Sequence, residues 1–78
     1  MRLRLFGRLR ALVDDGDCMI DLPHDVSTTE AVRQWLGRDH PELLASTVRI
    51  ALDDCLVQGD QPLGDAAEIG FLPPVSGG

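Results

Sequence analysis

Hydrophobic and polar residues alternate at several places along the chain, and each alternation predicts a β-strand. In "RLRLF", at positions 2–6, Leu3 and Leu5 share one face while arginines and Phe6 occupy the other. The same period of two recurs at 18–22, 48–52 and 68–72, as expected of strands with one buried face. A short "CLV" run at 55–57 follows an Asp-Asp turn and predicts a hairpin partner for 48–52. About five strands are therefore expected.

Between these strands, apolar residues spaced three and four apart predict helices. Leu9 begins one such pattern, which predicts a short helix that stops near Gly16. The main helix is expected to open at Ser27, because "SxxE" from Ser27 to Glu30 has the form of a capping box. A further helical turn is expected to begin at Pro41 and to run through Leu44. The main helix has an apolar stripe of Ala31, Val32, Trp35 and Leu36, and an expected water-facing side of Arg33, Gln34 and Arg38.

The order β, short α, β, α, short α, β, β, β predicts an α+β fold. A single mixed sheet of about five strands, with the main helix packed across one face, is a β-grasp. The helical crossover after the first two strands allows parallel neighbours in that sheet. We expect residues 1–72 to form one globular domain, and residues 73–78 to form a flexible carboxyl-terminal tail that ends in Gly-Gly.

Length and charge narrow the classes of function. Seventy-eight residues allow one small core, with little room for a buried catalytic cleft. Residues 1–10 hold four of the seven arginines and no acid, whereas the other positions hold all thirteen acids. This acidic balance argues against nucleic acid and favours docking to a basic protein surface. No apolar run is long enough to cross a bilayer, and the start lacks the features of a secretory signal, so a cytoplasmic location is expected.

The interior of the predicted domain offers no recognisable catalyst. His24 and His40 are sixteen residues apart, and no cysteine or third histidine lies at ligand spacing, so they do not suggest a metal site. Cys18 and Cys55 are interpreted as small apolar residues in a reducing compartment, with a single disulfide as the alternative. We therefore expect a protein that is not an enzyme and that binds no metal or cofactor itself.

Two surface features remain, and the first is an apolar pair. Phe6 shares a strand face with arginines, and Leu72 lies on the face opposite the predicted core. If the first and last strands are neighbours, these two residues form an exposed patch, with Arg4 or Arg10 at its rim. Such patches are typical of protein-binding sites. The alternative is that a helix or loop covers both residues as ordinary core.

The second feature is the final octapeptide, "FLPPVSGG". Pro73 and Pro74 favour an extended neck. Gly77 and Gly78 have no Cβ, so they can thread a channel too narrow for other residues. A carboxylate needs conversion to a better leaving group before it can react. The octapeptide thus predicts a carrier whose partners hold the catalytic groups, although linkers and cloning scars also end in Gly-Gly.

With "LFGRLRAL", "HPEL" and "LVQGDQPL", this octapeptide resembles the MoaD/ThiS family of ubiquitin-like sulfur carriers, and especially the MoaD type that serves molybdopterin synthase. The resemblance spans essentially the whole chain. It implies a ubiquitin-like β-grasp and an ATP-dependent, MoeB-like adenylyltransferase that activates Gly78. A thiocarboxylate then forms there, with sulfur supplied indirectly by a sulfurtransferase or cysteine desulfurase. The carrier would donate this sulfur to cyclic pyranopterin monophosphate within a heterotetramer with a MoaE-like large subunit.

The resemblance also implies site residues. Gly78 and Gly77 match the reactive end, and the partner-binding set comprises Phe6, Arg10, Leu56, Phe71, Leu72, Pro73, Pro74, Val75 and Ser76. Leu72 departs from the second aromatic that the family often has, and "DAAE" at 65–68 departs from its usual turn. The alternatives are a carrier for thiamine, cysteine or other thioacid-dependent synthesis, and a ubiquitin-like modifier. The chain has no lysine, so it cannot form lysine-linked chains on itself.

Overall fold

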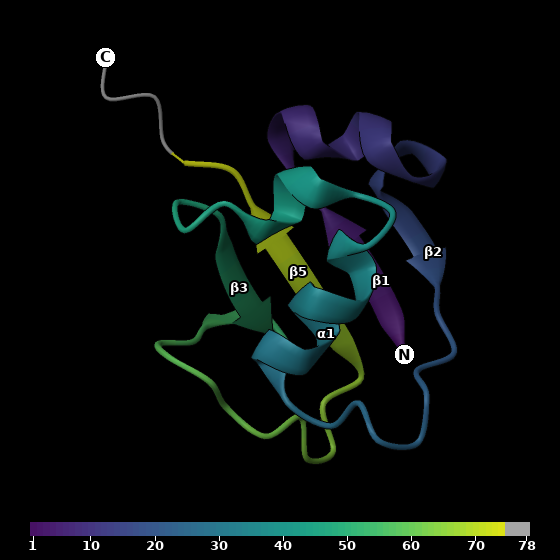
Figure 1. Ribbon diagram of the computed structural model, residues 1–78, viewed down its shortest axis with the longest axis vertical. Helices are drawn as coiled ribbons and strands as arrows, with labels where there is room; N and C mark the ends of the chain where they lie inside the picture. Colours follow the sequence, from purple (N-terminus) through teal and green to yellow (C-terminus); the bar gives the residue numbers. More distant parts are fainter. Residues whose placement is uncertain (75–78) are drawn as a thin grey trace.

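The computed structural model describes residues 1–74, which form one sheet with helical segments packed on it (Figure 1). The strands are β1 (Arg2–Leu5), β2 (Asp17–Met19), β3 (Arg49–Leu52), β4 (Cys55–Leu56) and β5 (Glu68–Leu72). The helix α1 spans Thr29–Gly37, and three short 3-10 segments are η1 (Gly7–Leu12), η2 (Asp14–Gly16) and η3 (Pro41–Leu44). The predicted order of elements is confirmed, with 3-10 geometry in the short helices.

The sheet is mixed. Its spatial order is β2-β1-β5-β3-β4, with β1 and β5 parallel and the other neighbours antiparallel. Figure 1 shows α1 lying across one face of the sheet. A five-stranded mixed sheet crossed by one main helix confirms the predicted β-grasp. Within the described residues, no helix is both long and apolar enough to span a membrane.

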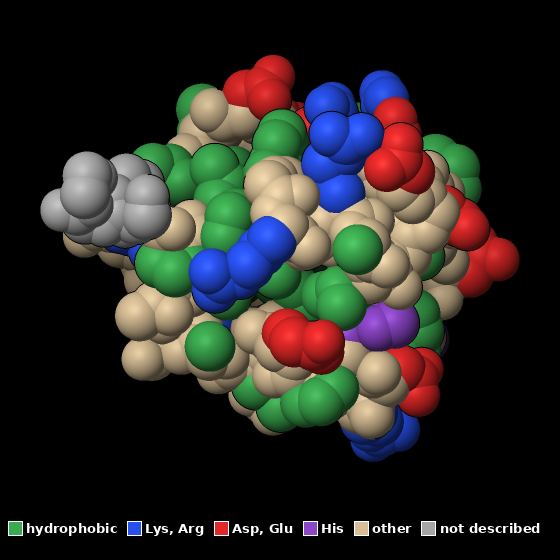
Figure 2. Space-filling view, turned by 90° about the horizontal axis from the view of Figure 1, so that it is seen from above, with side chains coloured by type: hydrophobic (Ala, Val, Ile, Leu, Met, Phe, Trp, Pro, Cys, Tyr) green, Lys and Arg blue, Asp and Glu red, His purple; other side chains and the backbone are tan. Residues whose placement is uncertain are grey.

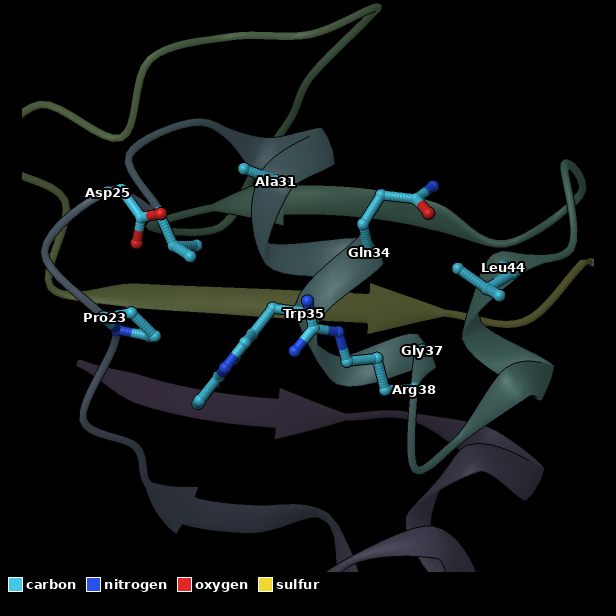
Figure 3. A pocket seen from close by; sticks show the side chains of 9 residues that line it. Pro23, Asp25, Ala31, Gln34, Trp35, Gly37, Arg38 and Leu44 are labelled. Carbon is cyan, nitrogen blue, oxygen red and sulfur yellow. The ribbon is translucent and has the colours of Figure 1, made fainter.

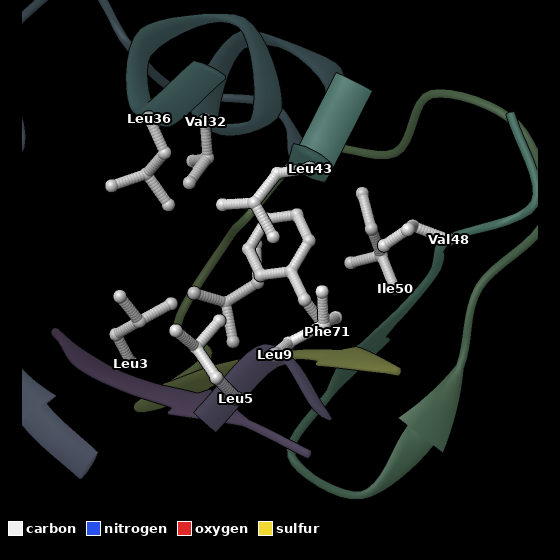
Figure 4. Packing of buried hydrophobic residues seen from close by; sticks show 10 residues of the cluster. Leu3, Leu5, Leu9, Val32, Leu36, Leu43, Val48, Ile50 and Phe71 are labelled. Atoms are coloured by element: carbon white, nitrogen blue, oxygen red, sulfur yellow. The ribbon is translucent and has the colours of Figure 1, made fainter. Parts of the chain in front are cut away.

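The core lies between the sheet and its helical layer (Figure 4). Side chains from β1, β3 and β5 point toward α1 and η3, as the alternation predicts. Each fully buried aliphatic or aromatic side chain contributes about 1.5–3 kcal/mol. The cluster consists of Leu3, Leu5, Leu9, Val32, Leu36, Leu43, Val48, Ile50, Ile69 and Phe71. Trp35 is only partly buried and packs against the cluster from its edge.

The start of α1 differs from the predicted capping box. The N-cap is Thr28, whose hydroxyl accepts a hydrogen bond from the Ala31 amide at 3.2 Å. The Glu30 amide instead donates to Asp60 Oδ1 at 3.0 Å. The carbonyl of Ser27 accepts from Leu63 in the facing loop. The prediction of Ser27 was wrong by one residue, because contacts with residues 60–63 set where the helix begins.

Arg33 was expected to face water, and this prediction was also wrong. Its side chain is only 11% exposed. One guanidinium nitrogen donates to the carbonyls of Leu43 at 3.3 Å and Ala45 at 3.0 Å. Its Nε lies 3.3 Å from Glu30 Oε2. Arg33 therefore fastens η3 to α1 by satisfying carbonyls at the end of a short helical turn.

β1 and β3 each lack one residue of the predicted range, and the two edge strands are also shorter than the alternation predicts. The strand expected at 18–22 is β2, which ends at Met19, and the Ile20 amide makes one more bond to the Met1 carbonyl at 2.8 Å. The strand expected at 55–57 is the two-residue β4, followed by a bond from the Val57 amide to Ile50 at 3.0 Å. Both are edge strands, where pairing on one side only favours short elements.

Candidate partner-binding face and carboxyl-terminal neck

The side chains of the sheet that point away from α1 form the open face. Residues directly opposite each other in neighbouring strands point to the same side, so the strand register fixes their arrangement. One row runs Arg4–Gly70–Ala51–Leu56 from β1 to β4. In the next row, Leu72 lies beside Arg49. Phe6, the residue after β1, is level with Leu72, because the preceding residues Leu5 and Phe71 pair with each other.

An apolar strip runs across this face; it consists of Phe6, Gly70, Ala51, Leu56 and Leu72. The Phe6 ring covers Gly70, since a Cβ added there would lie 3.0 Å from its Cε2 atom. Phe6 and Leu72 are half-buried, and Leu56 is 58% exposed. The first and last strands are thus neighbours, as the predicted patch required, and the patch is partly exposed. Pattern reasoning missed Gly70 and Ala51, although the same alternation placed them on this side.

Arg4 and Arg10 were both candidates for the rim of the patch. The Arg4 guanidinium lies 5.2 Å from the centre of the Phe6 ring and 3.8 Å from a Glu68 oxygen. Arg10 instead binds the Asp15 carboxylate at 3.0 Å, next to η1. The structure therefore places Arg4 on the rim, whereas Arg10 is tied to the η2 segment.

The far end of the open face is ionic and internally paired. Arg2 donates two hydrogen bonds to the Asp17 carboxylate, at 2.9 and 2.6 Å. That bonding holds the pKa of Asp17 below its ordinary value. The Arg2 Nε also lies 4.0 Å from Glu68. Because the pair is solvent-exposed, it adds little to stability, but it leaves this end with few charges to offer a partner.

The neck is the segment of Pro73 and Pro74 that follows β5. The Phe6 amide donates to the Phe71 carbonyl at 3.0 Å, which carries the β1–β5 pairing to the end of the strand. Pro73 then packs on Gly7, where an added Cβ would lie 2.8 Å from the proline Cγ atom. Gly7 has a φ of +55°, which favours glycine. Figure 2 shows hydrophobic and arginine side chains together on the end of the molecule that carries the neck.

Several predicted site residues need separate placement. Phe71 is fully buried in the core, so its predicted partner contact is corrected to a packing role. Pro73 and Pro74 are half-buried beside the strip. Val75, Ser76, Gly77 and Gly78 lie outside the described residues, and their predicted roles stay predictions.

A groove of about 650 Å³ lies on the helical side of the molecule (Figure 3). Gln34 and Trp35 line it from α1, Arg38 lines it from the C-cap of that helix, and Asp25 lines it from the preceding loop. Among residues 1–74, its lining includes no histidine, cysteine or serine to act as a base or nucleophile. Within residues 1–74, no cluster of three or more metal-ligating side chains was found.

The two cysteines lie on opposite edges of the sheet. Cys18 is in β2 and Cys55 is in β4, and both are free thiols. Four inter-strand spacings separate these strands, or about 19 Å, which excludes a disulfide between them within one chain. Burial raises the pKa of the Cys18 thiol, with a smaller contribution from nearby Asp14. This leaves Cys18 less reactive than an ordinary cysteine.

Comparison with known proteins adds two findings. A family model described as the ThiS family matches residues 3–78. The molybdopterin synthase sulfur carrier subunit of Escherichia coli (strain K12) is 34% identical over 87 aligned positions. The alignment covers 100% of this chain and 99% of that protein. The similarity thus includes both the open face and the final glycines.

Proposed function

Because the chain belongs to the ThiS family of sulfur carriers, which are not themselves catalysts, we propose that it serves as the sulfur carrier subunit of a molybdopterin synthase. The observation that carries this proposal is the similarity along the full chain to a protein of that name. The match extends through the final Gly-Gly, where the sulfur would be held. The chain would work in the cytoplasm and bind no cofactor itself.

The proposed chemistry takes place on the Gly78 carboxylate. An adenylyltransferase of the MoeB type would join it to AMP from ATP, with release of pyrophosphate. A persulfide formed by a cysteine desulfurase or sulfurtransferase would then displace AMP to give an acyl disulfide, and a thiol would reduce this bond, leaving the thiocarboxylate on Gly78 and a disulfide on the donor. Gly77 supports this role because two residues without side chains allow close approach of a partner's active site.

The open face supports the proposal as a docking surface. The apolar strip continues directly into the neck, so a partner that covers Phe6, Leu56 and Leu72 would receive the tail beside it. We propose that this partner is the large subunit, and that Pro73 and Pro74 direct the following residues toward its active site. Arg10, Val75 and Ser76 complete the proposed contact set.

Reconstitution tests this proposal. The protein is first loaded by its adenylyltransferase, ATP and a sulfur source, and then mixed with the purified large subunit and cyclic pyranopterin monophosphate. We expect dithiolene-containing molybdopterin to form, and a variant that lacks Gly78 to give none. Parallel reactions with a thiazole synthase and with a thioacid-dependent cysteine synthase provide the contrast. Transfer to either of those enzymes, without molybdopterin formation, would assign the carrier to another pathway.

A further inference from the structure

Two arginines flank the apolar strip on opposite sides of β5. Arg49, in β3, lies beside Leu72 of β5. On the other side, Arg4 of β1 pairs with Gly70 of β5. Opposite residues share a face, so both arginine side chains leave the sheet on the open face. Arg49 is exposed and Arg4 is partly exposed. The strip is therefore bordered by positive charge in a protein with a net charge of −6.

The acidic side chains near this border already form ion pairs with arginines of the same chain. Glu68 is within 4.0 Å of both Arg2 and Arg4, and Asp17 is bonded to Arg2. Within residues 1–74, no carboxylate lies within 4.0 Å of Arg49. Glu30 borders the same hollow as Arg49, but its carboxylate lies against Arg33.

From this arrangement, we propose that Arg4 and Arg49 recognise carboxylates on the large subunit. The inference rests on the proposed function and names the chemistry of its partner surface. It departs from the expectation from net charge, because the acid on the strip's border, Glu68, already lies within 4.0 Å of Arg2 and Arg4. Docking would remove water from the edges of the strip, and a guanidinium there then needs an anionic acceptor. A basic partner would instead place like charges together, which disfavours the complex.

Charge reversal at Arg49 tests the inference, with Arg38 as the matched control. Both are exposed arginines, and within residues 1–74 neither has an acidic partner within 4.0 Å. Arg38 lines the groove on the helical side, away from the open face. Arg49→Glu and Arg38→Glu change the net charge equally. Binding to the purified large subunit is followed by stopped-flow fluorescence at low and high salt.

We expect Arg49→Glu to lower the association rate about tenfold at low salt and to weaken its salt dependence. Arg38→Glu should stay close to wild type, and Arg4→Gln should give a smaller loss in the same direction. Thermal melting checks that each variant is folded, and Arg49→Gln replaces Arg49→Glu if the latter is not. A partner carboxylate reversed to arginine should restore binding of Arg49→Glu.

The remaining outcomes are decisive in different ways. Equal rates for Arg49→Glu and Arg38→Glu, with wild type binding normally, would overturn this inference and leave the proposed function standing. A loss confined to the adenylyltransferase reaction, with unchanged binding to the large subunit, would overturn the choice of partner. If wild type neither binds the large subunit nor supports molybdopterin formation, the proposed function itself fails.

Discussion

The two faces of the sheet use neighbouring residues of one strand for different purposes. On β5, Ile69 and Phe71 point inward and are fully buried, whereas Leu72 points outward and stays half-exposed. Gly70, between them, leaves space for the Phe6 ring on the outer side. The inner face pairs with α1 and is complete within the chain. The outer face is built of the same kinds of residue, but within residues 1–74 its strip is only partly covered.

This difference separates stability from function along a single strand. A change on the inner face should act on folding and reach binding only through it. A change on the open face should act on binding and leave folding nearly intact. The next predictions test that separation, beginning with the largest expected effect.

Phe71→Ala should have the largest effect on stability. Removing a fully buried phenylalanine typically costs about 3–5 kcal/mol, through lost burial and the cavity left behind. Domains are stable by only about 5–15 kcal/mol, so much of this variant should be unfolded in mild denaturant. Urea unfolding followed by circular dichroism measures the change. A loss below about 1 kcal/mol would show that the core does not depend on Phe71.

Leu72→Ala should separate the two faces most clearly. Its effect on unfolding should stay within about 1 kcal/mol, because the side chain is half-exposed. Affinity for the large subunit should fall about tenfold, as for a residue near the centre of an interface. Leu44→Ala is the control, since Leu44 is 41% exposed on the helical side. Equal affinities for the two variants would argue against the open face as the docking surface.

The sequence alone was enough to predict which residues of the last strand face the core and which face outward. Alternation exposes the difference between Phe71 and Leu72 because a strand sends successive side chains to opposite sides. The helical crossover also allowed parallel neighbours in the sheet, and the predicted patch had the pairing of the first and last strands as its condition, which the register of β1 and β5 meets. What it could not supply was long-range register. The place of Arg49 beside Leu72 depends on how β3 aligns with β5, which no local pattern encodes.

The errors have related causes. The N-cap of α1 is Thr28 because the loop at 60–63 supplies acceptors and donors to the first turn of the helix. Arg33 is buried because carbonyls at the end of η3 come within its reach. In both places, a tertiary contact overrides a local preference. The proposed acidic partner departs from the expectation from net charge for a related reason, since net charge sums over the whole surface while a partner meets only one face.

The helical layer allows a smaller test of the corrected cap. Thr28→Ala should lower the free energy of unfolding by about 1 kcal/mol, as the Ala31 amide loses its side-chain acceptor. Ser27→Ala should have little effect, because within residues 1–74 Ser27 makes its hydrogen bond through the backbone carbonyl and not through its hydroxyl. Chemical denaturation of both variants compares them directly. A larger loss for Ser27→Ala would restore the capping box first expected from the sequence.

The smallest expected effect concerns pH and the ionic end of the open face. The pKa of Asp17 is lower in the folded protein, chiefly because Arg2 donates hydrogen bonds to its carboxylate. Its stabilising contribution is therefore present above the unfolded pKa and is lost as the pH falls through the folded pKa. Asp17→Asn should melt slightly below wild type at neutral pH, and the difference should shrink as the pH falls below the ordinary pKa of an aspartate. Asp21→Asn is the control for the change in net charge. If Asp17→Asn and Asp21→Asn show the same dependence of melting temperature on pH, the Arg2–Asp17 pair has no specific effect on stability.

The central claim is that the chain carries sulfur on its last residue. The most direct measurement is the intact mass after incubation with ATP, the adenylyltransferase and a sulfur source, followed by mapping of the carboxyl-terminal peptide. We predict the mass gain of one oxygen exchanged for sulfur, confined to the peptide that contains Gly78. An unchanged mass, or sulfur held instead on Cys18 or Cys55, would contradict the account.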